Sequence, residues 1–218
     1  MGEITSFWGL FSYKPQWGLT PLGWLVVGVI LVLITRLMVV KIHPFLAPRQ
    51  PVEAEILLVE GWVSDDVMIG AIAEFYRGNY QLIITTGSPL IKGHFLCEYK
   101  NFADLAAATL VALGFEQSKI ISIPSPVVAI NRTQSAALTV RDWLLNYPEP
   151  IKGVNIYSWD VHTRRSWLLY RQTLQPEWKV GAIAHPPEFY DPQTWWTSSG
   201  GVRSIIAEAI AYLYARLS

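Results

Sequence analysis

Five short apolar runs alternate with longer segments of helical periodicity through most of the chain, and this alternation restricts the possible folds more than any other feature. The apolar runs, each of strand length, are residues 56–59, 82–85, 120–123, 154–157 and 180–184. Segments with the spacing of helices lie between them, at residues 65–78, 98–113, 132–146 and 162–174. Strands joined by helical segments pair in parallel, so the pattern predicts an α/β domain.

We therefore expect a Rossmann-like parallel sheet of about five strands with helices on both faces. The ligand site of such a sheet lies outside the carboxyl ends of its strands. A last helix is predicted at residues 202–217. Its apolar residues at helical spacing, which we expect to cover the core, are Ile205, Ile206, Ala209, Ile210 and Leu213.

Composition excludes several classes of protein. The chain has 17 basic and 17 acidic residues among 218, and this zero net charge argues against a nucleic-acid binder. The single cysteine, Cys97, rules out an internal disulfide. The four histidines show no paired ligand spacing, so we predict no metal site. Only 16% of the residues are charged, which suggests that part of the chain does not face water.

The part that avoids water is the apolar run that begins at Pro21 and ends at Val40. Its length matches the ~30 Å of a bilayer core, and we predict one transmembrane helix at residues 21–41. Arg36 lies near enough to the end for its charge to reach the head groups. A cleaved secretory signal is the rival interpretation, but the run is longer than a typical signal core and no small-x-small cleavage pattern follows it.

The segments on either side of this run complete the domain organisation. Residues 1–20 are rich in aromatic rings, which favours an interfacial N-terminal segment, either a short helix or an irregular tail. Prolines at 44, 48 and 51 predict a stiff linker over residues 42–53, and the α/β domain takes residues 54–218. The excess of basic residues after the run places that domain in the cytoplasm by the positive-inside rule.

The residues that could carry chemistry follow the predicted strands. Residues 157–166 pass from a strand into a helix, and a helix start with His162, Arg164 and Arg165 suits an anion. Further candidates at the same edge are Glu60, Gly61, Trp62, Asp65, Thr86, Gly87, Ser88, Asn131, Arg132, Thr133, Ser158 and His185. Glycine at positions 61 and 87 would let a ligand approach the backbone closely.

Each candidate also has a purely structural explanation. Glycines serve turns, Asn131 and Thr133 can cap a helix, and Arg164 and Arg165 can form a solvated helix face. The joint placement of so many candidates at one sheet edge favours a binding site for the set.

Standard signatures of catalysis and cofactor binding are missing from the sequence. It contains no G-x-G-x-x-G fingerprint, no G-x-x-x-x-G-K-[ST] phosphate loop and no G-x-S-x-G nucleophile elbow. A triad of Ser88 or Ser158 with His162 and Asp65 has no support from the spacing. The cofactor, if there is one, cannot be named from these residues.

Several motifs together carry a resemblance to a known family. They are the apolar N-terminal helix, Gly61 after the first strand, Thr86-Gly-Ser88 after the second, the acidic Glu98, Asn131-Arg-Thr133 at a helix start, and Ser158-x3-His162-x-x-Arg165-Ser166. In these features the chain, over about residues 54–185, resembles the SanA/ElyC/YdcF family of bacterial envelope proteins.

The resemblance implies a YdcF-like, Rossmann-like domain, often membrane-anchored, that takes part in cell-envelope integrity and in polysaccharide or lipid-carrier metabolism. Its pocket would be lined by Gly87, Ser88, Glu98, Thr133, His162 and Arg165. Anchored members of the family commonly face the periplasm, whereas the charge count favours the cytoplasm, so the side of the membrane stays open.

The first functional hypothesis is a single-pass membrane protein that binds, and can process, a phosphorylated or nucleotide-like envelope metabolite. Arg164 or Arg165 would hold the anion and His162 would donate or move a proton. Glu98 and Asp65 are candidate bases or hydroxyl-binding groups, and we count Glu98 with His162 as catalytic.

The alternative is a non-catalytic subunit that docks onto a larger membrane protein complex. Aromatic surfaces at both ends of the chain support it, among them the loop with Trp195 and Trp196. In both hypotheses the chain contacts the lipid bilayer and no nucleic acid.

Overall fold

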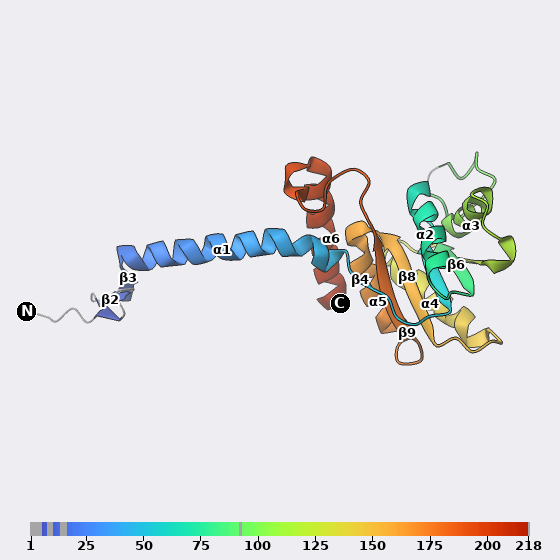
Figure 1. The fold of residues 1–218 in the computed structure, drawn as a ribbon, viewed down its shortest axis with the longest axis horizontal. Helices are drawn as coiled ribbons and strands as arrows, with labels where there is room; N and C mark the ends of the chain where they lie inside the picture. Colours follow the sequence, from blue (N-terminus) through green and yellow to red (C-terminus); the bar gives the residue numbers. More distant parts are fainter. Residues whose placement is uncertain (1–5, 8–10, 14–16, 92, 218) are drawn as a thin grey trace, which may run out of the picture. The chain divides into compact units, whose positions relative to one another are not determined.

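The computed structural model describes residues 6–7, 11–13, 17–91 and 93–217. The chain consists of two compact units, Met1–Ile42 and His43–Ser218. In the first unit a three-stranded antiparallel sheet precedes a long helix, α1 (Figure 1). Its strands are β1 (Ser6–Phe7), β2 (Phe11–Tyr13) and β3 (Trp17–Leu19). The described part of the N-terminal segment thus forms strands where we expected a helix or a tail, while Trp8 and Leu10 lie outside the described residues.

Helix α1 (Pro21–Leu46) has 26 residues and is long and apolar enough to cross a membrane. Its most apolar window has no buried residue, so the apolar side chains of this window are exposed. An exposed apolar helix near the N-terminus is typical of a membrane anchor or of a signal sequence. The helix is longer than the predicted residues 21–41, and its last turn, from His43, belongs to the second unit.

The second unit is built on a six-stranded sheet in the order β4-β9-β8-β5-β6-β7. Its strands are β4 (Arg49–Gln50), β5 (Ile56–Glu60), β6 (Leu82–Gly87), β7 (Ile120–Pro124), β8 (Gly153–Trp159) and β9 (Lys179–His185). The five strands from β5 to β9 are parallel, and β4 pairs antiparallel with β9 at the edge. The predicted Rossmann-like α/β fold is confirmed.

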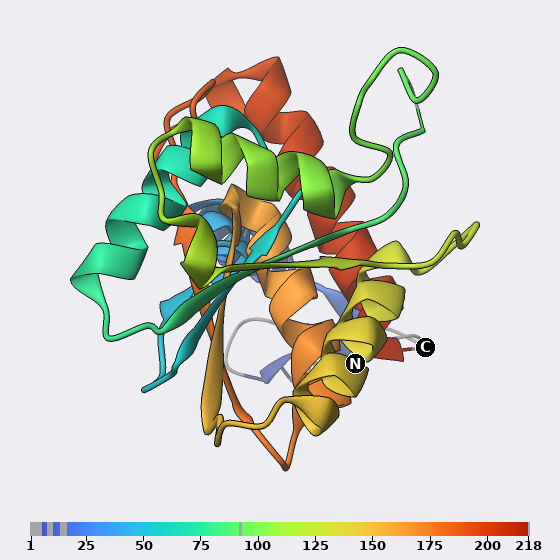
Figure 2. The same ribbon diagram turned by 90° about the vertical axis from the view of Figure 1, so that its right-hand side faces the viewer.

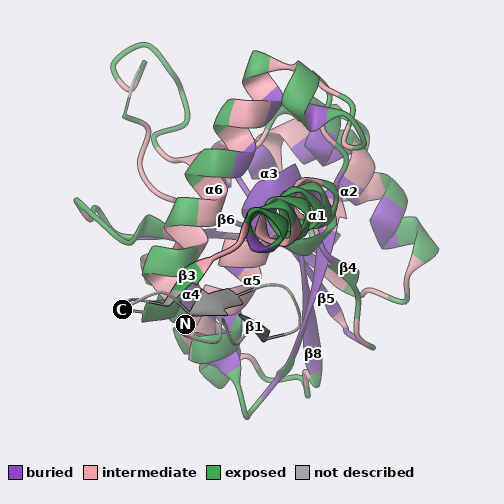
Figure 3. Cartoon of the chain, turned by 90° about the vertical axis from the view of Figure 1, so that its left-hand side faces the viewer, coloured by how far each residue is buried: buried purple, intermediate pink, exposed green. Residues whose placement is uncertain are grey.

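Helices cover both faces of this sheet (Figure 2). They are α2 (Asp65–Arg77), α3 (Phe102–Ala112), α4 (Arg132–Asn146), α5 (Thr163–Leu174) and α6 (Ser199–Leu217), with short 3-10 helices η1 (Gln117–Lys119), η2 (Asp160–His162) and η3 (Trp195–Thr197). Successive residues of β5 point to opposite faces, so Ile56 and Leu58 pack against α4 and α5, while Leu57 and Val59 pack against α2 and α3. The central strands β5 and β8 are buried along most of their length (Figure 3).

The strand order reverses direction between β5 and β8. From β5 the chain proceeds through α2 to β6 and through α3 to β7, then returns through α4 to β8 on the other side of β5. Parallel sheets bind ligands at such a switch point, in the crevice beyond the carboxyl ends of the two strands. Here those ends carry Glu60 and Ser158.

Residues 43–53 of the predicted stiff linker belong to the second unit. Its first residues complete α1, in which Leu46 is buried, and residues 49–50 form β4. The side chain of Asn155 in β8 then holds Val52, accepting from the Val52 nitrogen at 2.9 Å and donating to the Val52 oxygen at 2.8 Å. It also donates to the Tyr80 hydroxyl at 2.9 Å. A two-residue edge strand carries no sequence pattern, which is why the prediction missed it.

Helix α6 differs from the prediction in the face that it buries. Of the residues expected to cover the core, Ile205 is buried, but Ile206, Ile210 and Leu213 are exposed. The helix packs on α5 and η3 through a narrow stripe and leaves a broad apolar face uncovered. The sequence pattern could not identify the buried face because α6 is apolar on nearly all sides.

We predict that Asn155→Leu lowers the free energy of unfolding by about 2–4 kcal/mol, because the backbone groups of Val52 lose their partners inside the protein. Tryptophan fluorescence during urea unfolding of the detergent-solubilised chain measures the loss. Asn146→Ala is the control, since that side chain bonds one carbonyl at the exposed end of α4 and should cost under ~0.5 kcal/mol. Equal losses in the two variants would contradict a role of Asn155 in holding residues 47–55.

Candidate functional site

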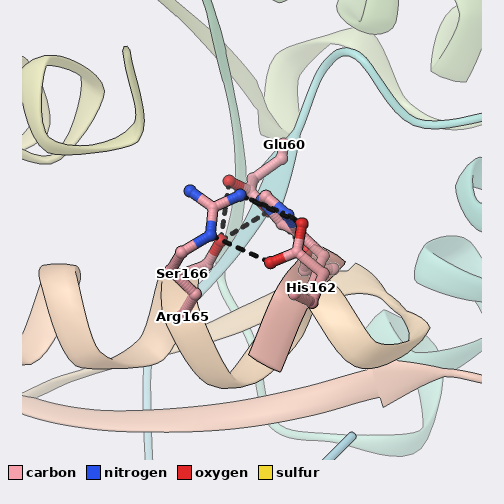
Figure 4. Close-up of polar contacts among 6 residues, drawn as sticks. Glu60, His162, Arg165 and Ser166 are labelled. Carbon is pink, nitrogen blue, oxygen red and sulfur yellow. Dashed lines mark hydrogen bonds and ion pairs between the residues drawn. The ribbon is translucent and has the colours of Figure 1, made fainter. Parts of the chain in front are cut away.

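A buried carboxylate, that of Glu60, lies at the switch point. Its side chain is 5% exposed. The hydroxyl of Ser158, from β8, donates to one oxygen, and that of Ser166, from α5, lies 3.0 and 3.1 Å from the two oxygens. His162, in η2, places Nε2 3.5 Å from the same carboxylate (Figure 4). Glu60 therefore ties together the two central strands and the helix that follows the second one.

His162 lies between two carboxylates. Its Nδ1 is 3.0 Å from Oε1 of Glu208, a residue of α6. Arg165 binds the same carboxylate with Nε at 2.9 Å and with one terminal nitrogen at 3.1 Å. The Trp62 ring packs edge-to-face with the imidazole, with the ring centroids of Trp62 and His162 4.7 Å apart. Two acids, one arginine and one imidazolium thus form a charge-balanced cluster.

The pKa values follow from this arrangement. Burial alone would lower the pKa of His162, but the negative charges of Glu60 and Glu208 outweigh it and raise the pKa to about 9. Burial alone would raise the pKa of Glu208, but hydrogen bonds from His162 and Arg165 lower it to about 2. The pKa of Glu60 is also lowered, because the His162 charge and the serine hydroxyls overcome the effect of burial. At neutral pH His162 is therefore an imidazolium.

A cavity of about 1000 Å³ opens beside this cluster. It is bounded by the carboxyl ends of β5 and β6, the start of α4, one side of α5 and the inner face of α6. Its polar lining consists of Glu60, Thr86, Ser88, Asn131, Arg132, Thr133, Gln134, His162, Arg165 and Glu208. This volume lies within the range of small-molecule binding sites.

Most of the predicted site residues meet at this cavity. The sequence placed Thr86, Gly87, Ser88, Asn131, Thr133, His162 and Arg165 in one site, and all of them line it. Asn131 has a positive φ of 57° and gives no side-chain cap to α4. The structural explanation for Asn131 as a helix cap therefore does not hold.

The other predicted residues lie elsewhere. Glu98 is exposed in the loop before α3, which begins at Phe102 and not at residue 98 as predicted. The guanidinium of Arg164 lies 4.3 Å from the Phe45 ring centroid and 5.3 Å from that of Trp167, outside the cavity lining. Ser158 is buried behind the cavity, where it holds Glu60.

Glycine is required at positions 61 and 87, but not for the predicted close approach of a ligand to the backbone. A side chain at Gly61 would collide with the backbone oxygen of Phe102, and one at Gly87 would come within 2.6 Å of the Phe102 Cβ. Both glycines let the start of α3 approach the strand ends closely. The close contact comes from the chain itself, and Gly61 does not line the cavity.

Two further histidines at the same edge are engaged away from the cavity. His185 Nε2 lies 2.7 Å from Asp66, and its Nδ1 lies 2.7 Å from the Tyr157 hydroxyl. His43 Nε2 lies 2.8 Å from the buried Asp160. Among the described residues no group of three or more possible ligands could hold a metal ion.

Sequence reasoning missed Glu208 and Ser166 as members of the site, and gave Arg132 no separate role. Glu208 lies 43 residues after Arg165 and reaches it only because α6 packs on α5. A single acid in an otherwise apolar helix was the available signal, since α6 contains no other carboxylate.

Fold and site together define a Rossmann-like α/β protein with an N-terminal apolar helix and a cavity at the switch point of its sheet. A comparison with protein-family models finds no match to this chain, and a search of curated proteins finds none either.

We predict that His162 stays protonated through pH 8 and titrates near pH 9. A raised pKa stabilises the fold fully below the ordinary value of about 6.5, and this stabilisation is lost as pH rises through 9. The free energy of unfolding should therefore fall by on the order of 3 kcal/mol across that window. NMR of the imidazole and urea unfolding at several pH values measure the two effects.

His162→Gln should remove this pH dependence, and His94→Gln, outside the cluster, should keep it. A His162 midpoint at or below about 6.5 would show that the carboxylates do not control this imidazole.

Proposed function

We propose that the chain is a membrane-attached protein that binds a phosphorylated or nucleotide-like metabolite in the cavity at the switch point. Cell-envelope metabolism, of polysaccharides or their lipid carriers, is the context that the SanA/ElyC/YdcF resemblance supplies. The observation that carries the proposal is a cavity of about 1000 Å³ that has a helix start and the Arg132 guanidinium, unpaired among the described residues, on one wall and a buried imidazolium on another.

The anion would bind at the start of α4 and not at Arg164 or Arg165. Glu208 already neutralises Arg165, and Arg164 lies on aromatic rings outside the cavity. The side chain of Arg132, the first residue of α4, forms no hydrogen bond or ion pair with another residue of the described part of the chain. The free backbone N–H groups of the first helical turn add to its charge, as in other phosphate sites at helix starts.

His162 supplies the reactive group of the proposed site. Its side chain is 8% exposed, and Nε2 has no hydrogen-bond partner among the described residues, since Glu60 is 3.5 Å away. An imidazolium N–H in this state can donate a hydrogen bond or a proton to an oxygen of the ligand. Glu60 and Glu208 keep the proton on the ring at neutral pH.

We predict that Arg132→Gln weakens binding of inorganic phosphate, glycerol phosphate and AMP by roughly 10–100-fold, because a charge-assisted hydrogen bond to phosphate is lost. Isothermal titration calorimetry on the solubilised full chain measures the affinities. Arg141→Gln is the matched control on the same helix, where Arg141 lies 3.7 Å from Glu177 and outside the cavity lining. Failure of the wild type to bind any of these probes, or equal effects of the two variants, would disprove the proposal.

Membrane attachment through α1 is the second part of the proposal. The exposed apolar surface of the helix supports it. We expect the chain to keep its N-terminal residues, to stay with membranes after an alkaline carbonate wash, and to dissolve in mild detergent. Mass spectrometry of the purified chain decides between anchor and signal, since a signal would be absent from the mature protein.

Docking onto a membrane complex remains the alternative. The exposed Phe189 and Trp196 support it, whereas Trp195 is buried and does not. A protein that copurifies at a fixed ratio in mild detergent would favour docking over ligand binding.

A further inference from the structure

Besides its charged groups, the cavity has an apolar wall. The residues that α6 contributes to it are Ala207, Glu208, Ile210, Ala211, Tyr214 and Ala215, all apolar or aromatic except Glu208. Leu169 of α5 and Ile130, just before α4, are further apolar residues of the cavity lining. The polar groups lie instead at the strand ends and at the start of α4. A small, fully hydrophilic ligand would leave the apolar half of the cavity in contact with water.

The apolar wall continues onto the open surface. Ile210 and Tyr214 line the cavity and are 63% exposed each, so this wall reaches the protein surface. Ile91 and Ile130, which also line the cavity, are 77% and 73% exposed. Large exposed apolar side chains mark a binding site when they form a continuous surface with a cavity.

We propose that the ligand is an amphiphile, with a phosphate group at Arg132 and the start of α4 and a hydrocarbon chain along the inner face of α6. This inference rests on the proposed phosphate site and adds the class of the molecule that bears the phosphate. From residue 207 to residue 215 the helix advances by eight residue steps and rises ~12 Å, which matches a hydrocarbon chain of roughly ten carbons. Alanines at 207, 211 and 215, one helical turn apart, leave room for the chain.

The test compares decyl phosphate with ethyl phosphate and decanol by calorimetry on the full chain in amphipol. Each buried methylene raises affinity about fourfold, so even half of the eight additional methylenes should make decyl phosphate bind on the order of 100-fold more tightly than ethyl phosphate. Decanol, which lacks the phosphate, should bind weakly.

Two variants test where the hydrocarbon chain of the ligand lies. Ile210→Asp adds a charge to the apolar wall, and Ala211→Phe fills the space in front of it. Both should abolish the preference for decyl phosphate while affinity for ethyl phosphate is kept, which also shows that the variants fold. Ile206→Asp is the matched control, because Ile206 lies one turn before Ile210, is comparably exposed at 52%, and does not line the cavity.

The outcomes separate this inference from the proposed function. Equal affinities for decyl and ethyl phosphate, both weakened by Arg132→Gln, would overturn the amphiphile and leave the phosphate site standing. If Ile206→Asp also loses the preference for decyl phosphate over ethyl phosphate, the hydrocarbon chain lies on the outer face of α6 and the inference is overturned. If neither phosphate binds, or if decanol binds as well as decyl phosphate and Arg132→Gln has no effect, the phosphate site itself fails.

Discussion

The buried carboxylate of Glu60 is the interaction on which the arrangement of the site depends. A carboxylate at 5% exposure is costly unless charges and hydrogen bonds compensate for it. The compensation comes from Ser158, Ser166 and His162, which belong to β8, α5 and η2. Because each partner comes from a different element, the charge can be satisfied only when the two halves of the sheet and the turn after β8 are assembled. One acid at the end of the central strand therefore specifies the geometry of the switch point.

His162 connects the buried charge of Glu60 to the last helix, α6, through its contact with Glu208. An imidazolium that faced Glu60 alone would have its other nitrogen buried, and Glu208 accepts from that nitrogen at 3.0 Å. Arg165 then balances Glu208. The four contacting side chains are neutral in total, which explains how four ionised groups can lie close together with little exposure, and why the cluster by itself does not attract an anion. Among the described residues of the cavity lining, Arg132 at the start of α4 carries a charge that no acidic side chain balances.

Much of the fold could be predicted from the sequence, and the reason is physical. Strand-length apolar runs separated by amphipathic segments leave few arrangements other than a parallel sheet with helices on both faces, and in that sheet the strand ends must meet. This logic brought Thr86, Ser88, Thr133 and His162 together correctly.

What the sequence could not supply were contacts decided by packing. Arg164 and Arg165 are neighbours on a helix, about 100° apart around its axis. Only the positions of α6 and of the last turn of α1 show which of them meets Glu208 and which meets Phe45. The glycines at 61 and 87 looked like openings for a ligand, but Phe102 at the start of α3 requires them. Spacing along the sequence carries no information about the partners of the two arginines or about the contact of the two glycines with Phe102.

The rotation of α6 about its own axis is another feature that spacing along the sequence does not determine. A helix that is apolar on nearly all sides has no preferred rotation on a protein surface, because every face would bury similar side chains. Its one carboxylate removes this ambiguity, since Glu208 can satisfy its charge only against His162 and Arg165. With residue 208 fixed there, helical geometry turns Ala207, Ala211 and Ala215 toward the cavity and leaves Ile206 and Leu213 outside. The small residues keep the cavity open, so an ion pair that serves packing also determines the shape and polarity of the wall that a ligand would meet.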